Sequence, residues 1–242
     1  MEHPRFYFGE PLTAGQLLEL PDTISRHFKA LRLQPGDHIT LFNGEGGEFS
    51  AELVSLERRH NQVKILAHHA TERESDLSIH LGLAVIRRDA MDFAIQKATE
   101  LGVSSITPIV SRFSNEPLNR AAARVGHWQR VVYAACEQCG RNRPAIINNA
   151  INLADWLAQV EQDKGIHLLL DPRADEGFTS LEKPPEMVVL MVGPEGGFAD
   201  EEVKAAVAAG FMDIRFGQRV MRAETAPIAA LAVIQHLWGD LA

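Results

Sequence analysis

The first seventy residues alternate apolar and polar positions in short runs, which is the pattern of half-buried strands. Glycine, proline and asparagine lie between these runs and favour turns. The predicted strands are Phe6–Phe8, Asp37–Phe42, Glu48–Val54 and Gln62–Leu66, and a short helix is predicted near Ser25–Ala30. Short strands at this spacing predict a small β-barrel, which we place at residues 1–72.

From residue 73 to residue 242 the pattern changes to apolar runs that alternate with segments of helical periodicity. Such alternation predicts an α/β domain with a parallel sheet. The predicted strands are Leu77–Ile86, Ile106–Val110, His167–Leu170, Met187–Val192 and Asp213–Phe216. The predicted helices are Ala90–Leu101, Asn119–Cys139, Leu153–Gln162, Asp200–Ala209 and Ala226–Leu241.

The glycine-rich stretch Val192–Phe198 connects a predicted buried strand to a predicted helix. Pro194 fixes φ and lacks an N–H, whereas Gly196 and Gly197 permit positive φ and expose bare backbone to a ligand. Three acids at positions 200–202 follow in the first helical turn. A phosphate would meet these negative charges, so the loop suits a nucleoside or a cationic ligand better. An ordinary strand-to-helix turn is the alternative.

Two further loops follow predicted strands in the same way, at Leu168–Pro172 and at Gly217–Ala226. Ligands of open parallel sheets bind beyond the carboxyl ends of the strands, so the three loops predict one binding site. The chain contains neither the G-x-G-x-x-G dinucleotide fingerprint nor the P-loop. The sequence therefore gives no support for binding of NAD or of a nucleoside triphosphate.

The composition indicates a globular protein, because 45% of the 242 residues are hydrophobic. No apolar run is long enough to span a membrane and no signal peptide precedes the first strand, so we expect a soluble, cytoplasmic protein without a membrane partner. The only cysteines, Cys136 and Cys139, lack a second pair or a histidine pair at zinc-binding spacing. We therefore expect no metal.

The net charge of −8 conceals an uneven distribution. Residues 112–143 hold six arginines and two glutamates, a local charge of +4, whereas residues 155–202 carry a local charge of −9. A basic segment on an acidic protein predicts a surface for RNA. A solvated helix face is the alternative interpretation.

Four sequence blocks resemble, in this order, the RsmE family of the SPOUT class of knotted methyltransferases. They are Lys97–Val103, Glu137–Arg141 with the preceding Trp128, Gly193–Phe198 and Gly217–Ala226. Leu31–Asp37 resembles part of that family's PUA-like domain. The chain departs from the family's expected Leu-Gly at Phe216-Gly217, which should alter packing near an adenine ring.

The resemblance implies a deep trefoil knot in the C-terminal domain, a PUA-like barrel in the N-terminal one, and a homodimer. It also implies S-adenosylmethionine as cofactor and methylation of N3 of a uridine in 16S ribosomal RNA of the small subunit. The expected cofactor contacts are Leu170, Asp171, Gly193, Pro194, Glu195, Gly196, Gly197, Phe216, Gly217, Val220, Met221, Glu224, Thr225 and Ala226. The expected RNA contacts are Arg32, Arg112, Arg120, Arg124 and Arg130.

Methylation at N3 requires loss of the imide proton, and the resulting negative charge spreads onto O2 and O4 of the uracil ring. A cation should face these oxygens, and the candidates are Arg222, Arg219 and, from a partner subunit, Arg141. Alternatively, Arg219 or Arg222 pairs with Glu224 to hold its loop. We expect Glu195 to order its own loop by accepting backbone amides rather than to act as a base.

Three alternatives stay open at this point. Thr225 either contacts the cofactor or caps the last helix. A related knotted enzyme would methylate a ribose 2′-hydroxyl of RNA instead of uridine N3. A non-catalytic RNA-binding assembly factor could keep the fold, but the glycine pair Gly196-Gly197 and the stretch Arg222–Thr225 argue against a lost cofactor site.

Overall fold

The computed structural model describes residues 3–57, 61–160, 164–178 and 186–241. Contacts divide the chain into two compact units, which are residues 1–74 with 136–144 and residues 75–135 with 145–242. The predicted division between residues 72 and 73 lies close to the first of these boundaries. The sequence did not indicate that residues 136–144 belong to the first unit. The predicted end of a helix at Gln162 lies outside the described residues.

The first unit contains, among its described residues, a five-stranded sheet in the order β1-β3-β4-β5-β2. Its elements are β1 (Arg5–Tyr7), β2 (Leu17–Glu19), α1 (Asp22–Ala30), β3 (His38–Phe42), β4 (Glu48–Leu56) and β5 (Asn61–His69). Four of these strands overlap the predicted ones, whereas the three-residue β2 was missed. β1 and β3 are parallel, and the other pairs are antiparallel. Phe6, Phe28 and Ile39 lie in its core.

The buried side chain of Arg5 explains why residues 136–144 belong to the first unit. Arg5 forms an ion pair with Glu48 and donates hydrogen bonds to Gly140 O at 3.2 Å and Asn142 Oδ1 at 2.6 Å. Burial raises the pKa of Glu48, but hydrogen bonds and charges from Arg73 and Arg5 outweigh it and hold the pKa below its ordinary value. A buried guanidinium requires hydrogen-bond acceptors and an opposite charge, and residues 136–144 supply two of the acceptors.

The second unit contains, in the part that the structure describes, a seven-stranded sheet in which every pairing is parallel. The strand order is β12-β10-β11-β6-β7-β8, and β9 also pairs with β7. The strands are β6 (Ser78–Ala84), β7 (Ser105–Val110), β8 (Ile146–Ile147), β9 (Ile151–Asn152), β10 (Ile166–Leu170), β11 (Met187–Val192) and β12 (Met212–Ile214). The predicted parallel sheet is confirmed.

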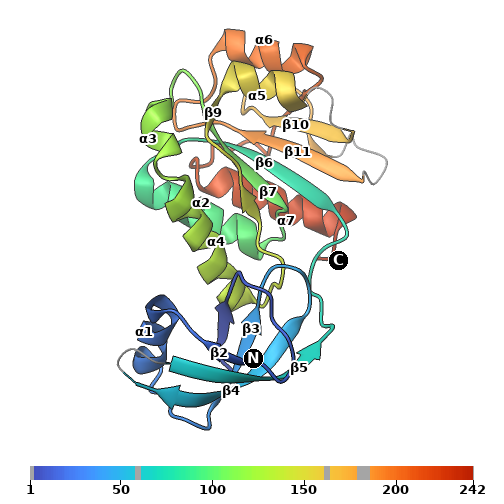
Figure 1. Cartoon of the computed structure of the whole chain (residues 1–242). Coiled ribbons are helices and arrows are strands. Elements are labelled where there is room, and N and C mark those ends of the chain that lie inside the picture. The colour runs from blue at the N-terminus through green and yellow to red at the C-terminus, as the bar shows by residue number, and fades with distance from the viewer. Residues whose placement is uncertain (1–2, 58–60, 161–163, 179–185, 242) are drawn as a thin grey trace. The chain divides into compact units, whose positions relative to one another are not determined.

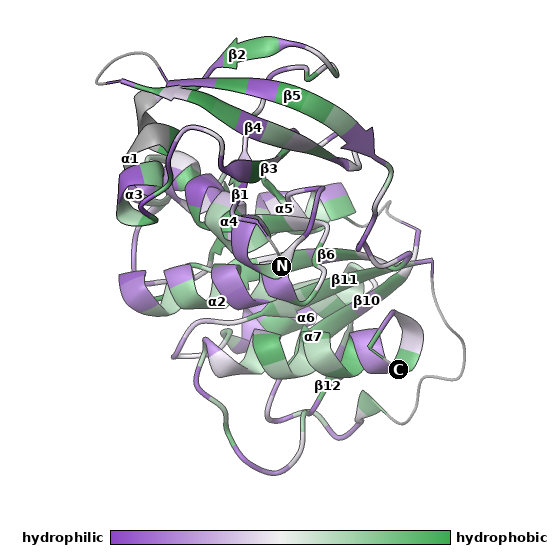
Figure 2. Cartoon of the chain, turned by 90° about the horizontal axis from the view of Figure 1, so that it is seen from below, coloured by the Kyte–Doolittle hydropathy of each residue, from purple (hydrophilic) through white to green (hydrophobic). Residues whose placement is uncertain are grey.

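Helices cover both faces of this sheet (Figure 1). Helices α2 (Arg88–Glu100) and α7 (Thr225–Trp238) lie on one face, and α5 (Leu153–Val160) and α6 (Asp200–Ala208) lie on the other. The central strands β6, β10 and β11 are hydrophobic over most of their length (Figure 2). This pattern is typical of strands that are buried on both faces.

The long helix predicted over Asn119–Cys139 is wrong, because the structure divides it into α3 (Leu118–Ala122) and α4 (Val125–Cys139). At the junction the Arg124 amide donates to Ala121 O and the His127 amide donates to Arg124 O, a tighter pattern than that of an α-helix. Gly126, a poor helix former, follows directly. The Arg124 guanidinium lies over the buried ring of Trp128, 5.1 Å from its centroid.

The described helices include none that is both long enough and apolar enough to cross a membrane.

Gly82 on β6 offers a test of how tightly the sheet packs. A Cβ atom at Gly82 would lie 2.4 Å from the Trp156 ring and 2.7 Å from Ile109 Cδ1. We expect Gly82→Ala to lower the free energy of unfolding by about 1–3 kcal/mol through overpacking. Gly126→Ala is the control, because its Cβ would meet no heavy atom within 4 Å and it should stabilise α4 by up to about 1 kcal/mol. Equal urea midpoints for both variants would contradict this packing.

Candidate functional site

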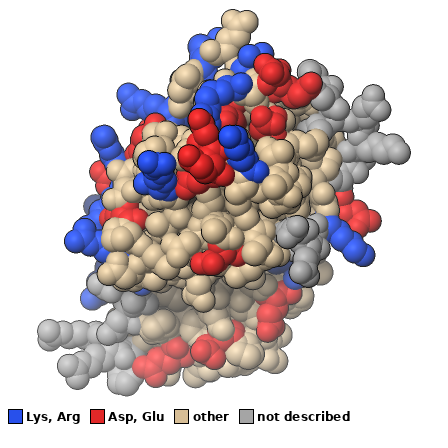
Figure 3. Space-filling view, turned by 90° about the horizontal axis from the view of Figure 1, so that it is seen from above, with Lys and Arg blue, Asp and Glu red and all other residues tan. Residues whose placement is uncertain are grey.

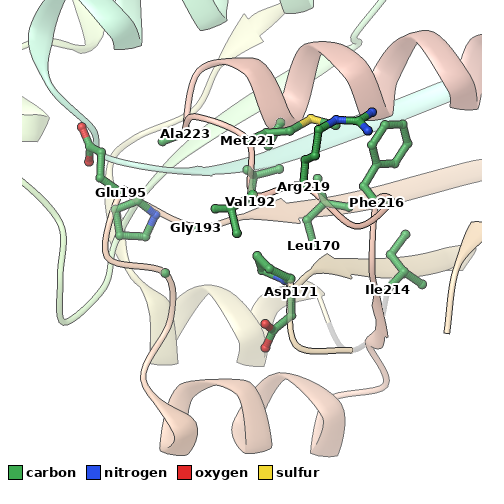
Figure 4. Close-up of a pocket in the computed structure, with 16 residues that line it drawn as sticks. Leu170, Asp171, Val192, Gly193, Glu195, Ile214, Phe216, Arg219, Met221 and Ala223 are labelled. Atoms are coloured by element: carbon green, nitrogen blue, oxygen red, sulfur yellow. The ribbon is translucent and has the colours of Figure 1, made fainter. Parts of the chain in front are cut away.

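The carboxyl ends of β10, β11 and β12 lie side by side, because these parallel strands pair in the register Leu170↔Val192 and Leu170↔Ile214. The loops that follow the three strands line one cavity with about 670 Å³ of empty volume, part of it open to solvent (Figure 4). The three loops singled out in the sequence therefore meet at one site. Because all their lining residues belong to the second unit, the site is built within that unit.

Most of the predicted ligand-binding residues line this cavity. They are Leu170, Asp171, Gly193, Pro194, Glu195, Gly197, Phe216, Gly217, Val220, Met221 and Ala226. Gly196, Glu224 and Thr225 are absent from its lining. Pro172, Val192 and Ala223 of the three predicted loops, and Ile214 at the end of β12, also line the cavity although they were not among the expected contacts. Arg219, expected as a catalytic group or as a partner of Glu224, lines it as well. Val192 and Ile214 are the last residues of their strands, a position that by itself indicates proximity to the rim.

The two glycines of the first loop have different roles. Gly197 has a φ of +69°, and its amide donates to Pro194 O at 2.8 Å, which closes a tight turn. A Cβ at Gly197 would meet no heavy atom within 4 Å, so the position opens onto the cavity that it lines. A Cβ at Gly196 would instead lie 3.0 Å from Phe113 Cβ. Gly197 therefore provides positive φ and bare backbone, whereas Gly196 permits close packing against Phe113.

Glu195 connects the glycine loop to two neighbouring loops. Its carboxylate accepts hydrogen bonds from Asn115 Nδ2 at 2.6 Å and from the backbone amide of Arg87 at 3.4 Å. Arg87 Nε lies 3.9 Å from the same carboxylate. Glu195 thus accepts one backbone amide, as an ordering residue would, but the amide belongs to the loop after β6 rather than to its own loop.

Arg173 joins the second loop to the start of α6. Its guanidinium pairs with Asp171 at 2.9 Å and with Asp200 at 2.6 Å, and it also donates to Phe198 O at 3.3 Å. Burial raises the pKa of Asp171, but the hydrogen bonds and charge of Arg173 outweigh burial and hold this pKa below its ordinary value. The Asp171 carboxylate points away from the centre of the cavity (Figure 4). Sequence reasoning missed Arg173, although it stands two residues after Asp171.

A second acid in the first turn of α6 also holds a loop. Glu202 accepts hydrogen bonds from the Ala199 amide at 2.9 Å and from the Arg112 amide at 2.8 Å. The acids at the start of α6 therefore fix the ends of neighbouring loops. This fixing occupies carboxylates that the sequence analysis treated as free negative charge.

The third loop places its two arginines differently. Arg219 lines the cavity, whereas the side chain of Arg222 is 85% exposed and lies 3.9 Å from Glu224. Arg222, Glu224 and Thr225 line a second hollow. Helix α7 begins at Thr225, with Glu224 at the N-cap position and no side-chain cap. The alternative of Thr225 as the N-cap is therefore wrong by one position.

Arg141 belongs to the first unit and is buried there. Its guanidinium forms an ion pair with Glu74 at 2.6 Å, and its Nε donates to the same carboxylate at 2.8 Å. Removal of a guanidinium from such a buried pair would leave Glu74 uncompensated. These contacts give Arg141 a structural role in its own chain, so Arg222 and Arg219 are the better placed catalytic candidates.

The basic segment 112–143 is largely paired with acids. Ion pairs join Arg112 to Glu201, Arg124 to Asp92 and Glu116, and Arg143 to Glu72, at distances of 3.5–3.8 Å. Arg120 and Arg130 are exposed and have no ion pair among the described residues. Arg32, in the first unit, is also exposed. Because four of the six arginines of this segment pair with acids, the local charge of +4 does not form one uniform positive surface. Basic and acidic side chains also interleave on the face of the molecule shown in Figure 3.

The cysteine pair is not arranged as a reactive site. A hydrogen bond with Cys139 and burial raise the pKa of the Cys136 thiol, whereas a reactive cysteine requires a lowered pKa. Within the described ranges, no group of three or more His, Cys, Asp or Glu side chains is placed to hold a metal ion.

Comparison with known proteins gives consistent matches along the chain. A family model for an RNA methyltransferase domain matches residues 73–235, and one for an RNA methyltransferase PUA domain matches residues 20–66. A ribosomal RNA small subunit methyltransferase E from Buchnera aphidicola (Schizaphis graminum) is 32% identical over 98% of both chains. The protein of that name from Synechocystis is 30% identical over 86% of this chain and 69% of its own.

Solved structures extend the likeness to three dimensions. Ribosomal RNA small subunit methyltransferase E from Neisseria gonorrhoeae, solved with S-adenosylmethionine, is 39% identical, with a TM-score of 0.92 over all of both chains. A Legionella pneumophila protein solved with the same cofactor is 34% identical, with a TM-score of 0.94 over all of both chains.

The Arg173 contacts predict a dependence of stability on pH. Because the pKa of Asp171 is lowered on folding, its carboxylate stabilises the folded protein above the unfolded pKa of about 3.9. This stabilisation is lost as the pH falls through the lower folded pKa. We expect Arg173→Gln to lower the urea midpoint at pH 7 and the difference from the parent to shrink below about pH 4.

Arg215→Gln is the matched control, because Arg215 is exposed and has no ion pair in the described ranges. It should leave the midpoint unchanged at both pH values. If Arg173→Gln lowers the urea midpoint by the same amount at pH 7 and pH 2.5, the loss of the ion pair with Asp171 is not the cause of the lower stability.

Proposed function

We propose that this chain, which belongs to the ribosomal RNA small subunit methyltransferase E family, transfers a methyl group from S-adenosylmethionine to N3 of a uridine in 16S ribosomal RNA. The observation that carries the proposal is the cavity at three strand-end loops in a chain that resembles two cofactor-bound relatives over its full length. The substrate is the RNA of the small ribosomal subunit, and the protein works in the cytoplasm, where that subunit is found.

The residues of the cavity fit S-adenosylmethionine. Leu170, Ile214 and Phe216 supply apolar walls for an adenine ring. Gly197 and Gly217 have positive φ, and a Cβ at either position would meet no heavy atom within 4 Å, so their backbone can approach a ligand closely.

When bound, the sulfonium supplies an electrophilic methyl group, whose bond to sulfur breaks with its electron pair left on sulfur as the bond to N3 forms. Uridine N3 releases its proton to water, and negative charge spreads over O2 and O4 of the ring. An arginine stabilises this charge with a preorganised guanidinium. Arg222 is our first candidate and Arg219 the second, because both stand on the third loop beside the cavity.

Nucleoside mapping tests the function directly. The purified protein, with S-adenosylmethionine, is incubated with small ribosomal subunits from cells that lack its gene, and the 16S RNA is digested and analysed by mass spectrometry. We expect one 3-methyluridine per RNA. A 2′-O-methylated nucleoside instead would establish the ribose methyltransferase alternative, and no methylation would favour an assembly factor.

We also propose a homodimer in which α7 lies at the interface. Helix α7 is apolar on more than its buried side. The partly or fully exposed apolar residues are Ala226, Ile228, Ala229, Ala232, Val233, Leu237 and Trp238. A helix that is hydrophobic around much of its circumference requires a partner on its outer side. Sedimentation velocity at micromolar concentration should give a dimer, and a monomer would contradict the proposal.

Two finer features of the fold belong to the same proposal. The family resemblance supports a deep trefoil knot in residues 73–242 and closure of the N-terminal sheet into a PUA-like barrel. A crystal structure of this chain with continuous density through the third loop would show whether the chain forms the knot. The same map would test whether β1 and β2 close the sheet.

Gly197→Val should abolish binding of S-adenosylmethionine. The branched side chain would occupy the cavity wall, and a φ of +69° would strain it by about 1–3 kcal/mol. Gly210→Val separates these two effects, because Gly210 has a φ of +93° at the end of α6 but does not line the cavity. Calorimetry should show that Gly210→Val retains parental affinity. Equal affinity in folded Gly197→Val would remove the glycine loop from the binding site.

Arg222→Ala should lower the single-turnover rate of methyl transfer by about 10²–10³-fold, and Arg222→Lys by less, because lysine keeps the charge but loses the planar fork. The affinity for S-adenosylmethionine should change much less than the rate. Arg215→Ala serves as the control, since Arg215 is exposed and lies in the same region of the chain. A parental rate in Arg222→Ala at saturating cofactor would transfer the role to Arg219.

Arg120→Glu combined with Arg130→Glu should weaken binding to 16S RNA. If each guanidinium contacts one phosphate, the slope of log affinity against log salt should become shallower by about 1.4–1.8. Cofactor affinity should stay at the parental value. Lys164→Glu combined with Lys204→Glu, at two exposed lysines outside α3 and α4, controls for the change in net charge. Equal slopes in the double variant and the control would identify α3 and α4 as a solvated face.

A further inference from the structure

A second hollow lies beside the cofactor cavity. It has about 990 Å³ of empty volume, part of it open solvent, and its lining includes Arg87, Arg88 and Phe93 from the start of α2. Arg222, Glu224 and Thr225 from the third loop and α7 form the other side. None of the residues from α2 was singled out in the sequence.

The third loop forms a wall that the two hollows share. Ala223 and Ala226 line the cofactor cavity, whereas their neighbours Arg222, Glu224 and Thr225 line the second hollow. Glu195 makes a second connection, because it lines the cofactor cavity and pairs with Arg87 of the hollow. A molecule in the second hollow would therefore lie next to the bound cofactor.

The arginines of the hollow are available to an anionic ligand. The side chains of Arg87, Arg88 and Arg222 are 82%, 74% and 85% exposed. Their acidic partners are Glu195, Glu116 and Glu224, at distances of 3.9, 3.5 and 3.9 Å. Exposed pairs of this kind contribute about 0–1 kcal/mol, so phosphate oxygens can replace them. Within the lining itself, the acids are Glu224 and Asp89 and the bases are the three arginines, whereas Glu195 and Glu116 are partners from outside the lining.

Phe93 places an aromatic ring among these charges. The residue is 46% exposed, although large aromatic side chains are usually buried. The Lys97 ammonium lies 5.9 Å from the ring centroid, while Lys97 itself pairs with Glu100. An exposed aromatic ring beside arginines is the arrangement that proteins use to stack an unpaired base and hold its phosphates.

We propose that the second hollow receives the target nucleotide after it has rotated out of the RNA, with its base stacked on Phe93 and its flanking phosphates held by Arg87 and Arg88. This inference rests on the proposed methyltransferase function, because only a methyl acceptor must lie against the cofactor cavity. Chemistry on a base requires the base to leave its stack, and the hollow provides the place for it.

The test compares three variants in methylation of small ribosomal subunits from cells that lack the gene. They are Phe93→Ala, Phe93→Trp and the double variant that combines Arg87→Ala and Arg88→Ala. Phe93→Ala should lower kcat/KM by about 5–150-fold, the range for loss of one stacked base, and Phe93→Trp should restore most of it. The arginine variant should raise KM and make it less dependent on salt. Affinity for S-adenosylmethionine should stay at the parental value in all three.

Val207→Ala and Lys204→Ala provide matched controls, because these exposed residues lie on α6 outside the hollow. Both should retain parental kcat/KM. A Phe93→Ala value within twofold of the parent would overturn the proposal. The proposal would also be overturned if Phe93→Ala lost its activity together with its dimeric state in sedimentation, because Phe93 would then be a subunit contact.

The failure of this inference differs from the failure of the proposed function. If the parent protein methylates a ribose instead of uridine N3, the proposed function fails, but the same variants still test the hollow. If the parent protein transfers no methyl group, the affinity of Phe93→Ala for 16S RNA tests whether the hollow binds a nucleotide. A parental affinity then overturns the hollow as a nucleotide site, and a 5–150-fold loss supports it.

Discussion

The parallel pairing of β10 with β11 and β12 is the constraint on which the site depends. This pairing brings the carboxyl ends of three strands from distant parts of the chain to one edge of the sheet. Each strand then delivers its loop to the same cavity. A shift of one residue in any strand would turn its side chains to the other face of the sheet, where they would meet different neighbours, so the packing of both faces fixes the position of the loops.

Charged side chains near the cavity hold loops in place more than they face the ligand. Arg173 joins Asp171 to Asp200, Glu202 caps the start of α6 while it accepts the Arg112 amide, and Glu195 reaches the loop after β6. These contacts order the backbone on three sides of the cavity. A site that binds its ligand largely through backbone and apolar walls needs such external support, because the walls themselves make few directional contacts.

The arginines divide into two groups with different physical roles. Arg5, Arg124 and Arg141 are largely buried and paired with acids, so they stabilise the chain's own fold. The exposed ones, such as Arg87, Arg120 and Arg222, keep a guanidinium in solvent. Local charge along the sequence does not distinguish these groups, because a salt bridge joins residues that are far apart in the chain. Only the exposed group is suited to phosphates or to charge that develops in a reaction.

The sequence alone determined the parallel sheet and the three loops, because continuous apolar runs and glycine-rich turns depend on local physical chemistry. Its pattern predicted the bounds of Met187–Val192 and the conformational freedom of Gly197. Tertiary structure decided the rest. The break between α3 and α4, the pairing of Arg173 and the hollow at Phe93 depend on contacts between distant segments, which the spacing of residues does not encode. The inclusion of residues 136–144 in the first unit has the same origin, since it requires the buried charge of Arg5 to find its partners.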